Sequence, residues 1–127
     1  MREAVSSPHA PQAVGPYSPA VRMGSLLFLS GQIPLDPATG AMVEGDIAAQ
    51  TRRVMDNLGA LLTAAGLSFE AVARTTVYLT DMADFPAMNA VYGTYFTAPA
   101  PARATVQVSA LPKGAQVEID LIAVDRR

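Results

Sequence analysis

The chain has 127 residues, of which 50% are hydrophobic, 16% charged and 6% aromatic. This length fits one globular domain, because it lies in the common range of about 100–150 residues and leaves no room for a second core. The net charge of −2, with basic residues scattered singly or in pairs, argues against binding of duplex nucleic acid through a basic stripe. No apolar run approaches the ~20 residues that span a bilayer and no signal-peptide pattern opens the chain, so we expect a cytoplasmic protein without a membrane anchor.

The residue types that the chain lacks narrow its chemistry. There is no cysteine, which excludes thiol nucleophiles, disulfides, thiolate zinc sites and iron–sulfur clusters. The one histidine, His9, lies in a Ser/Pro/Ala-rich leader, and a catalytic triad or a two-histidine metal site would have to be built around it. We therefore expect no metal site, and chemistry carried by Arg, Asp/Glu, Ser/Thr, Tyr, backbone groups and water.

The first predicted elements are two paired strands. Residues 1–14 are typical of a flexible N-terminal tail, and residues 15–127 form the single domain. Leu26–Ser30 is a short apolar run between two glycines, which predicts a strand buried on both faces. We expect it to pair with Tyr17–Val21 through the turn Met23-Gly24-Ser25.

Two helices and a strand follow. Asp46 to Ala65 predicts a helix with Asp46 as its N-cap and Gly66 at its stop. Its apolar face is Ile47, Thr51, Val54, Leu58, Leu61, Leu62 and Ala65. Val72–Leu79 alternates in the manner of a strand. Asp84 is the expected cap of a second helix, which ends before Pro99-Ala100-Pro101. The apolar stripe of this helix is Phe85, Met88, Val91, Tyr92, Tyr95 and Phe96.

The last elements complete an α+β fold of order ββαβαββ. Ala104–Val108 and Gln116–Val124 are predicted strands joined by the turn Leu111-Pro112-Lys113-Gly114. Two helices together cover only one face of such a mixed sheet. In the last strand, one face carries Val117, Ile119 and Leu121, and the other carries Glu118, Asp120, Ile122 and Val124. We expect this second, partly apolar and partly acidic face to be an interface of an oligomer.

Two charged residues are candidates for chemistry. Arg103 shares a strand face with Thr105, and we expect Val106 and Val108 to face the helices and Arg103 to face the interface, where its planar fork could hold a carboxylate. Its alternative is a solvated arginine or an ion pair. Glu118 lies inside an apolar run, where partial burial would raise its pKa and make it a proton acceptor from water. Its alternative is an exposed strand carboxylate.

Four further residues are weaker candidates. Gly31 would allow a ligand to approach the backbone, and Ser30 could donate a hydrogen bond, although both also suit a plain turn at the end of a strand. Tyr17 could line a pocket or cap the core. Asn89 could bind a ligand or face solvent on its helix.

Taken together, these residues resemble the RidA/YjgF family, small proteins that hydrolyse reactive enamine and imine intermediates. The resemblance covers roughly Ala13 to Val124. The matching segments are Gly15-Pro16-Tyr17-Ser18, Ser30-Gly31-Gln32-Ile33-Pro34, Gln50 with Asp56-Asn57-Leu58, Thr75-Thr76-Val77, Asn89-Ala90-Val91-Tyr92, Pro101-Ala102-Arg103 and Leu111-Pro112-Lys113-Gly114-Ala115-Gln116-Val117-Glu118-Ile119. The resemblance implies a chorismate-mutase-like fold, assembled as a homotrimer with its sites in the clefts between subunits.

The resemblance also implies roles for the candidate residues. Arg103 matches the arginine that grips the substrate carboxylate, and Glu118 matches the glutamate that positions or activates water. Tyr17, Ser30, Gly31 and Asn89 match residues that line the cleft. The chain departs from the family at Thr105, where deaminase-type members often carry cysteine, although the backbone N–H that could contact the carboxylate is retained.

The implied reaction is hydrolysis of 2-imino acids, such as 2-iminobutanoate or 2-iminopropanoate, to 2-keto acids and ammonia, without a cofactor. One alternative is a binding module that holds small carboxylates without turnover, which the departure at Thr105 favours. Another is a single-stranded ribonuclease, which the mild acidity and the one lysine disfavour.

Overall fold

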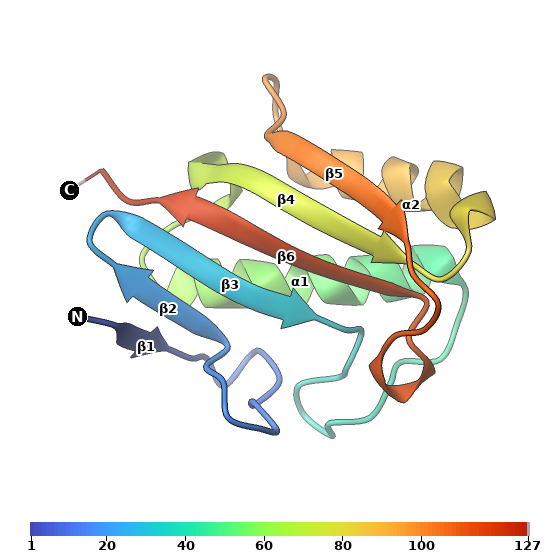
Figure 1. Ribbon diagram of the computed structural model, residues 1–127, viewed down its shortest axis with the longest axis horizontal. Helices are drawn as coiled ribbons and strands as arrows, with labels where there is room; N and C mark the ends of the chain where they lie inside the picture. Colours follow the sequence, from blue (N-terminus) through green and yellow to red (C-terminus); the bar gives the residue numbers. More distant parts are fainter. Residues whose placement is uncertain (127) are drawn as a thin grey trace.

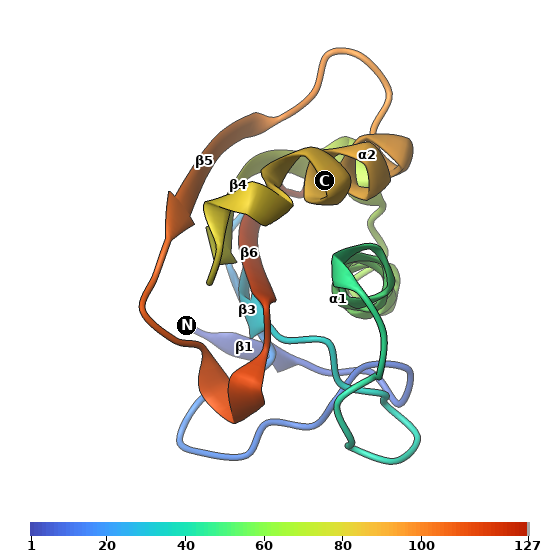
Figure 2. The same ribbon diagram turned by 90° about the vertical axis from the view of Figure 1, so that its right-hand side faces the viewer.

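The computed structural model describes residues 1–126 and has one six-stranded sheet with two helices against one face (Figures 1 and 2). The strands are β1 (Glu3–Val5), β2 (Ala20–Met23), β3 (Leu26–Gln32), β4 (Val72–Leu79), β5 (Ala102–Gln107) and β6 (Val117–Val124). Their spatial order is β1-β2-β3-β6-β4-β5. The β4–β5 pair is parallel and the other pairs are antiparallel, so the predicted mixed α+β sheet is confirmed.

Helix α1 (Ile47–Ala64) lies along the middle of the sheet. The Asp46 carboxylate accepts a hydrogen bond from the Ala49 N–H at 3.0 Å, which satisfies one of the free donors at the helix start. Gly66 has a φ of +79°, a conformation that glycine adopts without strain, and the helix ends there. The predicted apolar face is confirmed, because all of its residues are buried.

Helix α2 (Phe85–Tyr92) is shorter and is flanked by single 3₁₀ turns at Met82–Asp84 and Gly93–Tyr95. Asp84 occupies the N-cap position, but the expected capping hydrogen bond from its side chain is absent. The preceding 3₁₀ turn leads directly into the helix and gives Asp84 a helical backbone, whereas a capping residue is normally extended. Further 3₁₀ turns lie at Phe69–Ala71 and Pro112–Gly114.

The core lies between the helices and one face of the sheet. The alternation in β6 is as predicted, because Val117, Ile119 and Leu121 are at most 2% exposed and pack under the helices. Arg22 of β2 links the sheet to the end of α1. Its guanidinium donates to Asp125 Oδ2 at 2.6 Å and to the Ala65 carbonyl at 2.7 Å. The end of the sheet and the end of α1 are thereby joined.

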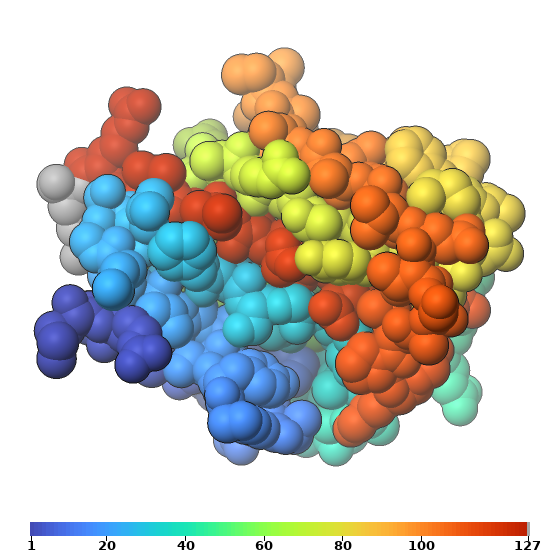
Figure 3. All heavy atoms as spheres, in the orientation of Figure 1, coloured from blue at the N-terminus to red at the C-terminus, as the bar shows by residue number. Residues whose placement is uncertain are grey.

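The opposite face of the sheet, which we call the open face, has no helix over it (Figures 2 and 3). Leu26 and Phe28 of β3 point to this face and are 38% and 40% exposed, whereas Leu27 and Leu29 are buried. The prediction that this strand is buried on both faces is therefore wrong for the single chain. The apolar run reflects a second surface that the chain does not cover itself.

Residues 1–14 contain more structure than a tail suggests. Strand β1 pairs antiparallel with β2, with Ala4 opposite Val21. Ala10 is 2% exposed and belongs to the core. This strand could not be predicted from the sequence, because a three-residue edge strand is too short to show alternation.

The last two strands are not neighbours, although a short turn separates them in the sequence. Strand β6 lies between β3 and β4, and β5 lies at the edge beside β4. The turn at Pro112–Gly114 therefore carries the chain past one strand. Among residues 1–126, no helix is both long enough and apolar enough to cross a membrane.

Candidate active site

Arg103 lies on the helix side of the sheet, opposite to the prediction. Strand β5 pairs with β4 so that Arg103 is beside Thr75, whose side chain is buried under the helices. Val106 faces the open side and is 42% exposed. The alternation of side chains along a strand correctly places Arg103 and Val106 on opposite faces. It does not tell which of the two faces the helices, because β5 is an edge strand that buries little on either face.

The Arg103 guanidinium stacks on two aromatic rings of α2. Its central carbon lies 4.8 Å from the centre of the Tyr92 ring and 5.4 Å from that of Phe85. The Tyr92 hydroxyl is hydrogen-bonded to the Thr75 hydroxyl at 2.7 Å, which holds the ring in place. Stacking uses the face of the guanidinium, so its N–H edge stays available for a carboxylate.

Polar atoms without partners accompany this arginine. Asn89 and Arg103 line one hollow of about 600 Å³ together with the loop Phe96–Pro101. The Asn89 Oδ1 and Thr105 Oγ1 atoms are buried and have no hydrogen-bond partner among the described residues. Buried polar atoms are normally paired, so Asn89 Oδ1, in a residue that lines the hollow, is a group that a polar ligand would satisfy, and Thr105 Oγ1 is a second unpaired atom on the strand face of Arg103. We call this hollow, with Thr105 beside it on β5, the Arg103 half-site.

Glu118 lies on the open side, directly opposite Tyr78 in the β4–β6 ladder. Partial burial and, to a lesser extent, the charge of Asp120 raise the pKa of Glu118 above its usual value. The carboxyl group lies over Gly31, where a Cβ atom would be 2.8 Å from Glu118 Cδ. Glycine at this position therefore makes room for the carboxylate, and the predicted close approach at Gly31 is made by a side chain of the same chain.

Glu118 and Gly31 line a second hollow, of about 240 Å³, together with Tyr17, Lys113 and the segment Pro11–Val14. We call it the Glu118 half-site. Most of its other lining residues are apolar: Pro19, Ile33, Leu35 and Pro112. Tyr17 is 50% exposed at its rim.

The Ser30 hydroxyl is used within the chain, whereas the sequence suggests that it could donate to a ligand. Its hydroxyl donates to the Ser18 carbonyl at 2.7 Å, and its N–H donates to the Pro19 carbonyl at 2.9 Å. Because its hydroxyl hydrogen is already used, Ser30 anchors the segment that carries Tyr17 and is not a free donor for a ligand.

The structure thus divides the candidate residues into two groups. Arg103, Asn89 and Thr105 belong to the helix side, whereas Glu118, Gly31 and Tyr17 belong to the other half-site. No described hollow is lined by both Arg103 and Glu118. One chain alone does not bring the two charged candidates together.

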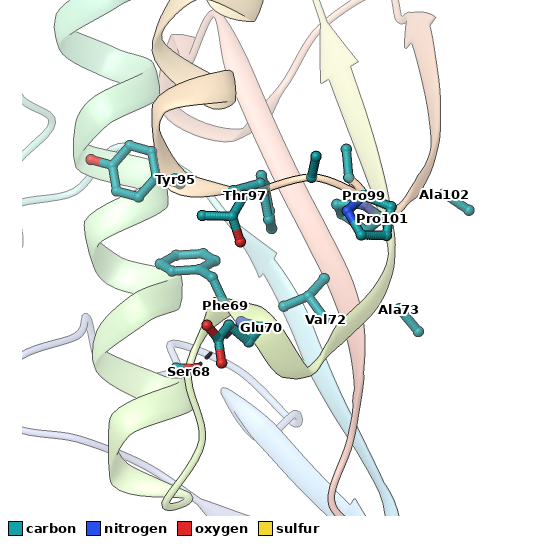
Figure 4. Close-up of a pocket in the computed structure, with 13 residues that line it drawn as sticks. Ser68, Phe69, Glu70, Val72, Ala73, Tyr95, Thr97, Pro99, Pro101 and Ala102 are labelled. Atoms are coloured by element: carbon teal, nitrogen blue, oxygen red, sulfur yellow. Dashed lines mark hydrogen bonds between the residues drawn. The ribbon is translucent and has the colours of Figure 1, made fainter.

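The largest hollow, of about 730 Å³, is a different one (Figure 4). It is an open groove between the start of β4 and the loop before β5, lined by Phe69, Tyr95, Pro99 and Pro101, with Glu70 as its only charged residue. None of the buried polar atoms that lack a partner among residues 1–126 belongs to its lining. Size alone does not make it the candidate site. Residues 1–126 also contain no group of three His, Cys, Asp or Glu side chains placed to hold a metal ion.

Three residues in or near the Glu118 half-site have roles that no local sequence pattern indicates. Lys113, the one lysine, lines the hollow from a left-handed backbone position with a φ of +56°. Gln50 accepts a hydrogen bond from the Gln116 N–H at 3.0 Å and so fixes the chain two residues before Glu118. Tyr78 donates to Asp120 at 2.9 Å. Only the pairing of β4 with β6 and the packing of α1 bring these residues close, and neither is visible in a local pattern.

Comparison with known proteins identifies relatives along the whole chain. The profile of the family described as Endoribonuclease L-PSP matches residues 7–125. The protein DfrA of Myxococcus xanthus is 62% identical over 125 residues, covering 97% of this chain and 95% of DfrA. The mouse 2-iminobutanoate/2-iminopropanoate deaminase is 47% identical over 124 residues, covering 98% of this chain and 92% of the mouse protein.

A solved structure agrees with these sequence matches. The crystal structure of YyfA from Yersinia pestis, described as a protein of unknown function of the conserved Rid family, has a TM-score of 0.95 and 44% identity, with 98% of this chain and 99% of YyfA covered. Its identity and coverage are high enough to extend the similarity from the fold to the family. The chain therefore belongs to the Endoribonuclease L-PSP family, the RidA/YjgF family that its motifs resemble.

Proposed function

We propose that this protein hydrolyses 2-imino acids, including 2-iminobutanoate and 2-iminopropanoate, to 2-keto acids and ammonia at sites formed between the subunits of a homotrimer. The observation that carries this proposal is the pair of half-sites, one with a stacked arginine and the other with a carboxylate of raised pKa. A 2-imino acid needs a cation for its carboxylate and a base for the attacking water. The mouse relative is named for this reaction.

The Arg103 half-site suits the carboxylate end of the substrate. The guanidinium would donate two parallel hydrogen bonds to the carboxylate, and the stacked Tyr92 and Phe85 rings would keep the fork from turning. The Thr105 hydroxyl is free to donate to the same group, and Asn89 Oδ1 is free to accept from the imine N–H. These contacts would orient the imine carbon toward water.

Glu118 suits the role of the base. Water adds through its oxygen to the imine carbon while Glu118 accepts one of its protons and passes it to the imine nitrogen, so the C=N bond becomes a C–N single bond and a carbinolamine forms. When this tetrahedral intermediate collapses, Glu118 takes the hydroxyl proton and delivers it to the amino nitrogen, the C–O bond becomes the keto group, and the C–N bond breaks to release ammonia. The raised pKa of Glu118 makes it a better proton acceptor than an ordinary carboxylate.

The subunit arrangement is supported by the two faces of the sheet. Arg103 and Glu118 lie on opposite sides of one chain, so a complete site needs Arg103 from one subunit and Glu118 from its neighbour. The open face also exposes Met23, Leu26, Phe28 and Val106 by 38% to 46%, an apolar surface suited to contact between copies. A closed ring of three would cover three such faces.

The test is hydrolysis of 2-iminobutanoate and 2-iminopropanoate generated in situ, with labelled single-stranded RNA assayed in parallel. We expect the wild-type protein to accelerate imine loss. Glu118→Gln removes the proton acceptor and should lower kcat by ~10²-fold. Arg103→Lys keeps the charge but loses the fork and should lower kcat/KM more than tenfold, the equivalent of ~1.4 kcal/mol.

Matched controls keep the assay specific. Glu70→Gln and Arg52→Lys change an exposed carboxylate and an exposed arginine that line neither half-site, and both should retain wild-type turnover. Binding of a 2-keto acid without turnover of imines would instead make the protein a carboxylate-binding module. Cleavage of RNA without imine hydrolysis would favour the ribonuclease alternative.

A further inference from the structure

Glu118 has two polar neighbours on the open face that the proposed mechanism does not use. Side chains at alternate positions of a strand share a face, so Asp120 lies beside Glu118 on β6. On β4, Tyr78 is directly opposite Glu118, and Thr76 is directly opposite Asp120. Tyr78 reaches diagonally across the ladder and donates its hydroxyl to Asp120 Oδ2 at 2.9 Å. Two carboxyl groups and one phenol therefore form a single cluster.

The hydrogen bond holds the Asp120 carboxyl group in place on the open face, beside Glu118. The same contact is the largest cause of the raised pKa of Tyr78. Asp120 is a smaller cause than burial of the raised pKa of Glu118, and it acts through its charge.

The other groups around Glu118 do not neutralise it. Lys113 and Tyr17 line the same hollow, and Arg74 lies on the same face of β4, opposite Ile122. Within residues 1–126, no arginine, lysine or histidine nitrogen lies within 4.0 Å of the Glu118 carboxylate. Strand β3, on the other side of β6, contributes no titratable side chain. Asp120 is therefore the charged neighbour that acts most directly on Glu118.

We propose that Asp120, held in place by the Tyr78 hydroxyl, is a positioning residue that makes Glu118 a stronger proton acceptor. The inference rests on the proposed function, because it assigns Asp120 an effect on the base of imine hydrolysis. Asp120 does not touch the reacting atoms. Its negative charge disfavours a second negative charge on the neighbouring Glu118 carboxylate, so transfer of a proton to Glu118 becomes more favourable. Tyr78 acts one step further away, by holding the Asp120 carboxyl group beside Glu118.

The direct test is the titration of Glu118 followed by NMR with ¹³C-labelled glutamate carboxyl groups, using Glu118→Gln to assign the signal. Asp120→Asn preserves the size of the side chain and removes its charge, and it should move the midpoint of the Glu118 titration to lower pH. Tyr78→Phe should lower the midpoint by less, because Asp120 stays but its carboxyl group is held less firmly beside Glu118. Glu70→Gln should leave the midpoint in place.

The kinetic test compares pH profiles of kcat/KM for imine hydrolysis. A base works when deprotonated, so the rate rises with pH through the pKa of Glu118, and Asp120→Asn should move this acidic limb to lower pH by the amount found by NMR. The titration of the substrate is common to all variants and cancels in the comparison. Oligomer mass is measured for each variant, and Tyr78→Phe provides a second reading if Asp120→Asn does not assemble.

The two measurements separate the possible failures. If the wild-type protein does not hydrolyse imines, the proposed function fails, and with it the role of Asp120 in catalysis, whatever NMR reports. If imines are hydrolysed but neither variant moves the Glu118 titration, the inference alone is wrong. It is also wrong if the titration moves and the acidic limb does not.

Discussion

At Gly31 the backbone of β3 comes so close to Glu118 that a side chain has no room between them. An added Cβ would lie 2.8 Å from Glu118 Cδ, and the atoms in conflict belong to the end of a flexible side chain. The carboxylate can move away, so the main consequence of a larger residue is a misplaced Glu118.

Gly31→Ala should therefore lower kcat/KM for imine hydrolysis more than tenfold with little change in the free energy of unfolding. Gly24→Ala is the opposite control, because Gly24 has a φ of +60° in an open turn. It should lose ~1 kcal/mol of stability and keep its activity. Denaturant unfolding and imine kinetics on both variants check the prediction, which fails if Gly31→Ala is destabilised but fully active.

The sequence allows the identity of these residues to be predicted better than their orientation. Their places in the strand pattern make Arg103 and Glu118 candidates, and the family resemblance selects them. The side of the sheet on which Arg103 lies depends on the register of β5 with β4, where Thr75 is its neighbour, and no pattern within β5 contains that information. The Tyr78–Asp120 contact likewise depends on the pairing of β4 with β6.

At the scale of elements, α1 is both a cover for the core and an anchor for loops. Asn57 is fully buried, and its amide donates to the Leu35 carbonyl at 2.9 Å while its Oδ1 accepts from Arg53. Gln50 holds the chain before β6 in the same way. Buried amides of this kind stabilise one arrangement of the loops, because leaving their partners unpaired costs about 1–3 kcal/mol each.

A second contact fastens the 3₁₀ turn Gly93–Tyr95 to α1. The Tyr95 hydroxyl donates to Asp56 Oδ1 at 2.7 Å, and burial together with the Asp56 hydrogen bond raises the pKa of Tyr95 to about 12. A tyrosine whose pKa is raised on folding contributes stability that is present below its unfolded value of 10.0 and is lost as pH rises toward 12.

Wild-type protein should therefore lose thermal stability between pH 10 and about 12 more steeply than Tyr95→Phe, which lacks the titrating hydroxyl. At neutral pH the variant should be less stable by ~1 kcal/mol, the usual net value of one hydrogen bond. Melting temperatures across this range check the prediction. Parallel curves for the two proteins would show that Tyr95 does not contribute to the alkaline loss.

Elements with strong periodicity could be predicted closely, and those defined by their neighbours could not. The predicted helix Asp46 to Ala65 and the structural helix Ile47–Ala64 differ by one residue at each end, and β4 is as predicted. Strand β1 was missed, and β6 lies between β3 and β4, away from the strand that precedes it in sequence. Turn residues specify where a chain reverses, but not beside which strand it then pairs.

At the scale of the whole molecule, the open face is the feature that the single chain does not explain. It combines exposed apolar residues with Glu118 and Asp120 on one surface. The sequence predicts this face from the alternation in the last strand, because two helices cannot cover both sides of the sheet. Alternation shows which residues share this face, but it cannot predict how two copies of the chain pack against each other there.

The proposed homotrimer would cover this face and complete the site. Light scattering on the purified protein should give a mass three times that of the 13.3 kDa chain and independent of concentration in the micromolar range. Replacing Phe28 by Glu would place a charge in the apolar part of the face and should shift the mass toward that of the monomer. A wild-type protein that is a stable monomer would contradict both the assembly and the shared site.

Mixed trimers test the central claim, that imine hydrolysis takes Arg103 from one subunit and Glu118 from its neighbour. Arg103→Lys and Glu118→Gln subunits are each expected to be nearly inactive alone. When they are co-assembled in equal amounts, random assortment should give an intact pair at about a quarter of the sites, and activity should rise to about a quarter of the wild-type value. If mixed trimers, confirmed by two affinity tags, are no more active than either parent, the two residues do not meet across a subunit boundary and the account is contradicted.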